Sequence, residues 1–275
     1  MQDLTSSLEM QYFSRTRNES AFMTLDGIDC LLHYDATKYN HHMARFSIFL
    51  AGAAYYESSL RYNLDVMGFA DIHSNYDINH MHDVAYTFAH HAVENVVAVI
   101  IRGTQGSALE WAGNFTAGGF HIAMGLVWRK LSAYIGSRSS IDRSSLRIWI
   151  TGHSRGAAVA YLMGYSLTSP LGGRYRQEDV FVYTFAGPRV SLARGIPRKN
   201  IFNFINADDP LAAVIPGMQK PGRTARFSMF MHPHTFEYFQ NLTGEAYRPF
   251  WPWHSHTPEA YMALLLATDD VTLSN

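Results

Sequence analysis

The stretch that indicates the fold most strongly is Trp149-Ile150-Thr151-Gly152-His153-Ser154-Arg155-Gly156-Ala157-Ala158. Apolar residues before it (146–150) predict a buried strand, and small residues after it (157–162) predict a helix. Between them stands Gly-His-Ser-Arg-Gly, a G-x-S-x-G pattern that is typical of a nucleophile elbow when it joins a strand to a helix. Glycine is needed two residues before and after the serine because so sharp a turn leaves no room for a Cβ atom. We therefore predict a strained Ser154 with its hydroxyl exposed at the head of the helix, where N–H groups favour negative charge.

The same pentapeptide is compatible with a glycine-rich helix start whose serine is only a cap, so the rest of the chain has to decide. Strand patterns alternate with helix patterns, which predicts an α/β fold with a mostly parallel central sheet and helices on both faces. Residues 1–40 are polar, and we expect them to be irregular. The expected helices cover residues 41–60, 120–135 and 258–267. The expected strands cover residues 83–90, 96–101, 180–185 and 201–205, and an edge strand is expected over 226–231. Loops are expected over residues 71–83 and 217–224.

The composition sets limits on the class of protein. A chain of 275 residues with 47% hydrophobic residues can bury a sizeable core, and we expect one domain over residues 1–275. The formal net charge of −1 argues against nucleic acid as a main partner. The single cysteine excludes an internal disulfide, and the apolar stretches are too short to span a bilayer. No signal peptide is evident, so we expect a cytoplasmic protein, or a secreted one if a leader has been removed.

A serine hydroxyl needs a base within hydrogen-bond reach and a carboxylate that orients the base. In an α/β-hydrolase the acid follows the serine in the chain and the histidine comes last. Asp208 and Asp209 both follow the strand at 201–205, and we favour Asp209 because it lies further onto the turn made rigid by the next proline. His256 directly precedes the cap of the last helix and is the favoured base, with His254 as the alternative. His121 is better explained as a packed or hydrogen-bonded histidine than as a base.

An oxyanion hole requires two donors. The backbone N–H of Arg155, the residue after the nucleophile, supplies one. Thr104 can supply the other, because it follows the strand at 96–101 and because Gly103 lets the backbone come close. Glycine breaks between residues 105 and 119 suggest a lid. The histidines and aspartates of residues 71–91 have no recognised ligand spacing, and no phosphate-binding or dinucleotide-binding glycine motif is present, so we expect neither a metal nor a cofactor.

Four segments together resemble the class 3 lipase family of α/β-hydrolases. They are Val99-Ile100-Ile101-Arg102-Gly103-Thr104, Thr151-Gly152-His153-Ser154-Arg155-Gly156, Tyr183-Thr184-Phe185-Ala186-Gly187-Pro188-Arg189-Val190, and residues 206–210, in which Asn206 stands three residues before Asp209. His256, with Tyr261 five residues later, is also similar to the histidine segment of that family.

The resemblance implies a carboxylic ester hydrolase with Ser154 as nucleophile, Asp209 as acid, His256 as base, and Thr104 and Arg155 as oxyanion donors. It also implies a lid over an acyl pocket, formed by residues 106–115 with Trp111. Two positions depart from the family pattern. Arg155 replaces a frequent leucine, which alters the charge of the pocket, and the usual valine-proline pair is displaced to Val214-Ile215-Pro216, which keeps Asp208 as an alternative acid.

The first hypothesis is therefore ester hydrolysis through an acyl-enzyme, by a lipase or esterase that acts on an ester or lipid and makes transient contact with a lipid surface. A non-catalytic lipid-binding or partner-binding domain on the same fold is the second hypothesis. Acyl transfer to an alcohol other than water is the third, because it would use the same residues. The sequence leaves the acyl chain length, the headgroup and the oligomeric state open.

Overall fold

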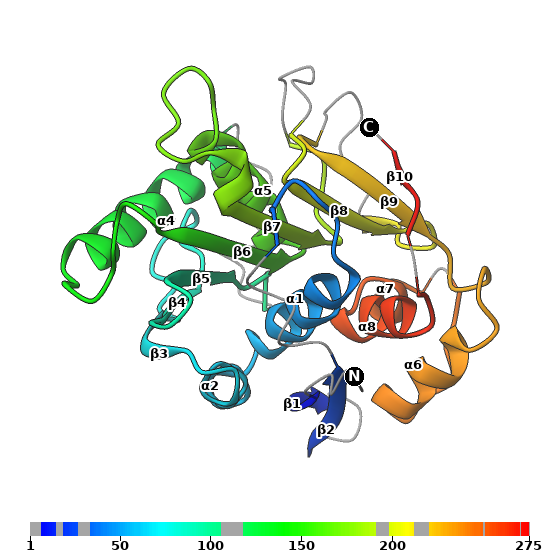
Figure 1. The fold of residues 1–275 in the computed structure, drawn as a ribbon. Coiled ribbons are helices and arrows are strands. Elements are labelled where there is room, and N and C mark those ends of the chain that lie inside the picture. The colour runs from blue at the N-terminus through cyan, green and yellow to red at the C-terminus, as the bar shows by residue number, and fades with distance from the viewer. Residues whose placement is uncertain are drawn as a thin grey trace, which may run out of the picture.

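A computed structural model describes residues 7–14, 19–26, 34–105, 118–190, 198–211, 220–249, 251–269 and 271–274. Its main element is an eight-stranded sheet with the strand order β10-β9-β8-β7-β6-β5-β4-β3 (Figure 1). The strands are β3 (Ala70–Asn75), β4 (Tyr86–His91), β5 (Val96–Ile101), β6 (Arg147–His153), β7 (Val180–Phe185), β8 (Ile201–Asn206), β9 (Arg223–Phe227) and β10 (Leu273–Ser274).

The middle of this sheet is parallel. Strands β5 to β9 pair in parallel, whereas β3, β4 and β10 are joined to the sheet by antiparallel pairing. Every residue of β5, β7 and β8 is buried. Burial on both faces explains why β5 and β7 appear in the sequence as largely apolar runs rather than alternating ones. The predicted parallel sheet is confirmed, and the carboxyl ends of its strands meet at one edge.

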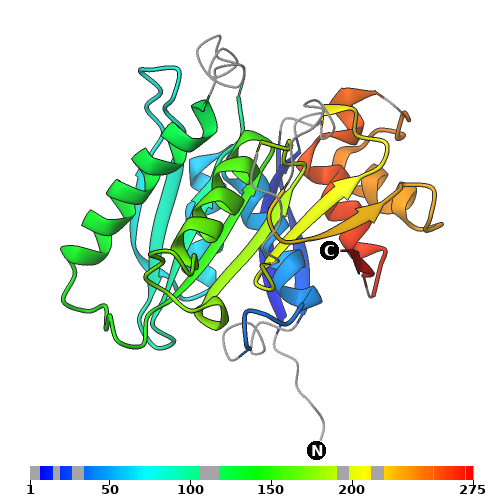
Figure 2. The same ribbon diagram turned by 90° about the horizontal axis from the view of Figure 1, so that it is seen from above.

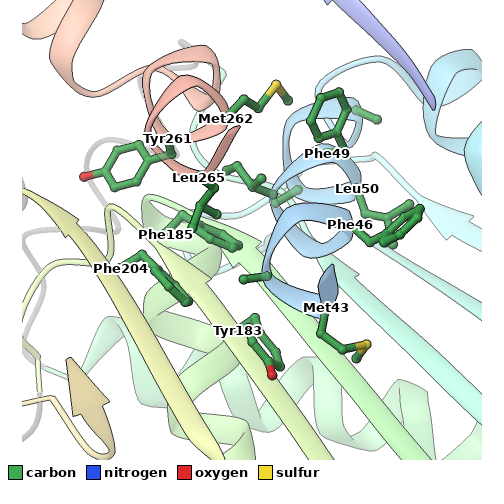
Figure 3. Packing of buried hydrophobic residues seen from close by; sticks show 14 of the residues in the cluster. Met43, Phe46, Phe49, Leu50, Tyr183, Phe185, Phe204, Tyr261, Met262 and Leu265 are labelled. Atoms are coloured by element: carbon green, nitrogen blue, oxygen red, sulfur yellow. The ribbon is translucent and has the colours of Figure 1, made fainter. Parts of the chain in front are cut away.

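Helices cover both faces of the sheet, as predicted. On one face lie α4 (Gly119–Gly136) and α5 (Arg155–Leu167), and on the other lie α1 (His41–Ala53) and α8 (Pro258–Leu266) (Figures 1 and 2). Each face has its own cluster of buried hydrophobic residues. On the second face, buried side chains of α1 and α8 pack on aromatic rings of β7 and β8 (Figure 3). The helices contribute Phe46, Phe49, Tyr261 and Leu265, and the strands contribute Tyr183, Phe185 and Phe204.

The prediction that residues 1–40 are irregular is wrong for two segments. Strands β1 (Ser7–Ser14) and β2 (Glu19–Asp26) form an antiparallel two-stranded sheet. Alternate residues of β1, from Met10 through Tyr12, are buried, and the Tyr12 ring meets Phe49 of α1 edge-on at 6.2 Å. The sequence of β1 does alternate between buried and more exposed positions, but the many polar residues around it made this alternation hard to recognise.

Other predicted boundaries also change. The helix expected over residues 41–60 is two helices, because α1 ends at Ala53 and α2 (Glu57–Val66) starts after a short connection. Residues 71–75 of the expected loop belong to β3, and β9 begins at Arg223, inside the second expected loop. β9 is not an edge strand, because β10 pairs with it on the outer side. Two further helices, α6 (Thr235–Thr243) and α7 (Pro252–Ser255), were not anticipated.

Candidate active site

The turn between β6 and α5 holds Ser154 in a conformation that few L-residues adopt. Its φ is 57° and its ψ is −124°. A Cβ on Gly152 would lie 2.6 Å from the carbonyl carbon of Gly156, and a Cβ on Gly156 would lie 2.1 Å from the carbonyl oxygen of Ile101. These short distances bear out the explanation by crowding: both glycines are needed because α5 starts against the ends of β5 and β6.

Two other segments reach this serine from distant parts of the chain. His256, between α7 and α8, has its Nε2 2.8 Å from Ser154 Oγ. Its Nδ1 lies 2.7 Å from Oδ2 of Asp209, which follows β8. The Asp209 side chain is fully buried, whereas 16% of the His256 side chain is exposed. The structure thus joins a hydroxyl, an imidazole and a carboxylate in one hydrogen-bonded line at the carboxyl edge of the sheet.

The neighbouring carboxylate, Asp208, faces another way. Its Oδ2 accepts hydrogen bonds from the Ser228 hydroxyl and the Met229 N–H, both at 3.2 Å. Asp208 therefore holds the end of β9 in place, while Asp209 reaches the imidazole. The displaced segment Val214-Ile215-Pro216 lies outside the described residues.

The alternative histidine, His254, is also occupied elsewhere. Its Nδ1 accepts the Arg248 N–H at 3.0 Å, and its Nε2 lies 3.2 Å from Oε2 of Glu245. It therefore anchors the segment that leads into α7. His121 is exposed on α4 and is not part of the hydrogen-bonded line.

Two buried polar residues hold the acid in place. Tyr261 on α8 donates its hydroxyl hydrogen to Asp209 Oδ2 at 2.8 Å and accepts the Asn206 N–H at 3.1 Å. Complete burial, reinforced by the negative charge of Asp209, raises the pKa of Tyr261 well above its usual value, so the phenol keeps its proton and remains a donor. The sequence contained both residues in the acid and histidine segments, but their spacing did not reveal what they bind.

Asn206 also connects the acid segment to the histidine segment. Its side-chain amide donates to the Ser255 carbonyl at 3.0 Å, and its Oδ1 accepts the Asp208 N–H at 3.2 Å. Because Asn206 is completely buried, these bonds are shielded from water. They set the spacing between the end of β8 and the residue before His256.

The two predicted oxyanion donors come from two segments next to Ser154, the start of α5 and the segment that follows β5. Arg155 opens α5, where the first N–H groups of a helix have no acceptor within the helix. Thr104 is half-buried and follows Gly103, whose Cβ, if it had one, would lie 3.1 Å from Cβ of Ser154. The Arg155 guanidinium is buried and donates to the main-chain carbonyls of Met81, at 2.9 Å, and Asp83, at 3.3 Å.

Other predicted residues also fall outside the described residues. These are the residues of the proposed lid, 106–115 with Trp111. Across the described ranges, no three His, Cys, Asp or Glu side chains converge to hold a metal ion. None of the helices within those same ranges is both long and apolar enough to cross a membrane.

A serine at a strand-to-helix turn, followed along the chain by its acid and then its histidine at the carboxyl edge of a mostly parallel sheet, is the arrangement of an α/β-hydrolase. Residues 116–218 match the family model described as lipase (class 3), which confirms the resemblance of the chain to that family. The matched segment includes Ser154 and Asp209, whereas Thr104 and His256 lie outside it.

Solved structures support the same fold. One similar structure is the triacylglyceride lipase of Rhizomucor miehei, with 18% identity, a TM-score of 0.51, and coverage of 67% of this chain and 78% of that chain. A deletion variant of the Rhizomucor miehei lipase in a propeptide complex has 17% identity and a TM-score of 0.51, with 82% and 80% covered. A triacylglycerol lipase whose catalytic centre is described as a serine protease triad has 20% identity and a TM-score of 0.51, with 67% and 78% covered. The comparison with curated proteins gave no match.

Proposed function

We propose that this chain is a serine carboxylic ester hydrolase, a lipase or esterase that cleaves an ester or lipid through an acyl-enzyme. The observation that carries the proposal is the line of hydrogen bonds from Ser154 Oγ through the His256 imidazole to Asp209 Oδ2, at 2.8 and 2.7 Å. The match of residues 116–218 to class 3 lipases supports the same chemistry.

In the first half of the reaction His256 acts as the base. As Ser154 Oγ attacks the ester carbonyl carbon, Nε2 of His256 takes the hydroxyl proton. Asp209 stabilises the imidazolium that forms, and it keeps the ring in the tautomer whose Nε2 is free to accept. The imidazolium then gives the proton to the departing alkoxide, which leaves as an alcohol.

The negative charge that develops on the carbonyl oxygen is stabilised by two hydrogen-bond donors. The backbone N–H of Arg155 points out of the start of α5, where the helix dipole adds to its effect. Thr104 supplies a second donor from the segment that follows β5. In the second half, His256 takes a proton from water, the hydroxide attacks the acyl carbon, and the carboxylic acid leaves as Ser154 regains its proton.

Exposed apolar side chains near this edge support a transient contact with a lipid surface. Phe230 is 58% exposed and Met231 is 65% exposed, and both follow the carboxyl end of β9. Trp251, 48% exposed, directly precedes α7 in the segment that leads to His256. Phe230 and Met231 are consecutive, and a contiguous exposed apolar patch marks a place where a protein meets an apolar partner. For an enzyme that takes lipid esters, that partner is the substrate aggregate.

Hydrolysis of p-nitrophenyl esters tests the proposal. Ser154→Ala is expected to lower kcat/KM by about 10⁴-fold or more, because the nucleophile is lost. Ser166→Ala is the matched control: this serine is exposed on α5 and should leave the rate unchanged. Full activity of Ser154→Ala in a folded protein would refute the proposal. The same assay with acyl chains of increasing length shows whether short or long esters are preferred.

A further inference from the structure

His153, the residue before the serine, contacts the proposed base directly. It is the last residue of β6 and only 2% exposed. Its Nε2 lies 2.7 Å from the main-chain oxygen of His256, and the two imidazole rings lie 5.1 Å apart, centre to centre. A side chain that sits beside the nucleophile in the sequence thus touches the backbone of the base, 103 residues away.

A second contact sets the proton position on His153. A carbonyl oxygen can only accept a hydrogen bond, so Nε2 of His153 carries the hydrogen. In a neutral imidazole the other nitrogen, Nδ1, then has a lone pair, and it lies 2.9 Å from the Tyr55 hydroxyl. Tyr55 donates to it and so favours the tautomer that holds His256.

Tyr55 occupies the connection between α1 and α2 and reaches the oxyanion side of the site as well. A Cβ on Gly103 would lie 2.1 Å from the Tyr55 hydroxyl, which places this phenol against the segment that carries Thr104. The side-chain amide of Gln105 donates to the Tyr55 carbonyl at 3.2 Å. The tyrosine therefore packs between the predicted oxyanion segment and His153.

We propose that His153 is a positioning residue: its Nε2–H holds the main chain of His256 so that the imidazole stays between Ser154 and Asp209, and Tyr55 supports it by fixing the His153 tautomer. This inference rests on the proposed function of the same site. His256 needs such support because α8 begins only at Pro258, so the backbone of His256 lies outside the helix. A displacement of about 1 Å in a reacting group can cost about 100-fold in rate.

The experiment compares two substitutions of equal length. His153→Gln keeps an N–H donor close to the original position of Nε2, whereas His153→Met fills similar space without a donor. We expect His153→Met to lower kcat for a p-nitrophenyl ester by about 100-fold with KM within about threefold of the parent value, because His153 acts on the position of the base and not on substrate binding. His153→Gln should recover at least about tenfold of that loss.

Tyr55→Phe gives a second measurement, and its effect in the parent protein does not depend on whether the His153 variants fold. It should lower kcat by about three- to tenfold in the parent protein and have no effect in the His153→Met background, because the hydroxyl acts through the imidazole. Thermal unfolding of every variant is followed in parallel, and only folded protein is assayed.

The outcomes separate this inference from the proposed function. If a fluorophosphonate does not label Ser154 in the parent protein, the proposed function fails. If the label is present but His153→Met is as fast as the parent, or His153→Gln is no faster than His153→Met, His153 has no positioning role. Should the His153 variants not fold, a Tyr55→Phe protein with unchanged kcat overturns the inference instead.

Discussion

The nucleophile and the pair formed by Asp209 and His256 are held in place by different physical means. Ser154 is positioned by its backbone: a positive φ and two glycines allow α5 to start against β5 and β6. Asp209 and His256 lie on segments between regular elements, and buried polar side chains hold them there. Steric crowding positions the first region and hydrogen bonding positions the second.

This difference determines how each region should respond to substitution. The elbow has almost no freedom to adjust, because the atoms that a new Cβ would meet belong to the backbone. The acid and base segments can move when one hydrogen bond is lost, since other contacts remain. We therefore expect changes at the elbow to affect folding and rate together, and changes in the polar network to affect mainly the rate.

The largest contrast is expected between the two neighbouring aspartates. Asp209→Asn should lower kcat by about 10⁴-fold, because the amide favours the wrong imidazole tautomer and cannot stabilise the imidazolium. Asp208→Asn is the control: this carboxylate binds Ser228 and Met229, so the rate should change by less than about tenfold. Steady-state kinetics of ester hydrolysis give kcat for both proteins. A larger loss in Asp208→Asn would mean that the acid has been misassigned.

The steric half of the comparison is tested by Gly156→Ala. The added Cβ would lie 2.1 Å from the Ile101 oxygen and 2.8 Å from the carbonyl carbon of Arg102. Overpacking of this kind should lower the free energy of unfolding by about 1–3 kcal/mol or more, and a displaced Ser154 should slow hydrolysis by about 100-fold. Urea denaturation and ester hydrolysis measure the two effects.

Gly125→Ala is the matched control for that substitution. Gly125 is also in a helix, α4, but a Cβ there would meet no atom within 4 Å. Alanine should therefore raise the stability by about 0.4–1 kcal/mol and leave the rate unchanged. Equal effects of the two alanines would contradict the claim that crowding holds the elbow.

A smaller effect is expected in the polar network. Tyr261→Phe removes the hydroxyl that donates to Asp209, a bond to a charged group worth about 1.5–3 kcal/mol. Because the imidazole still holds the carboxylate, we expect only about a tenfold loss in kcat. Tyr161→Phe also removes a buried hydroxyl, but one that donates to the Pro188 carbonyl at 2.8 Å, away from the acid. If both variants lose the same fraction of kcat, the hydrogen bond from Tyr261 to Asp209 has no particular role in the reaction.

The parts of the fold that follow from local patterns could be predicted from the sequence. Fully buried strands such as β5 and β7 appear as apolar runs, and the elbow has its own pentapeptide. The strands β1 and β2 were missed because only alternate residues of β1 are buried. The helix α6 was missed because its N-cap, His234, is not one of the residues that usually start a helix. The mostly parallel pairing followed from the alternation of strands and helices along the chain, but the order of the strands was not predicted.

The three central residues of the candidate site could be predicted from the sequence, but the residues that support them could not. Ser154, Asp209 and His256 were predicted from chain order and loop position, and the structure brings them into contact, although their catalytic roles stay a prediction. The supporting residues His153 and Tyr55 were not found. His153 lies within the pentapeptide, which gives no sign of its partner. Tyr55 was assigned to a helix over residues 41–60, whereas α1 ends at Ala53.

Covalent labelling tests most directly whether the His256 imidazole activates Ser154. The parent protein and two variants, His256→Gln and His254→Gln, are incubated with a fluorophosphonate, and the modified peptide is located by mass spectrometry. We expect the label on Ser154 in the parent protein and in His254→Gln, and we expect labelling of Ser154 to be at least about 100-fold slower in His256→Gln. A label on another residue, or equal labelling rates in all three proteins, would contradict this expectation.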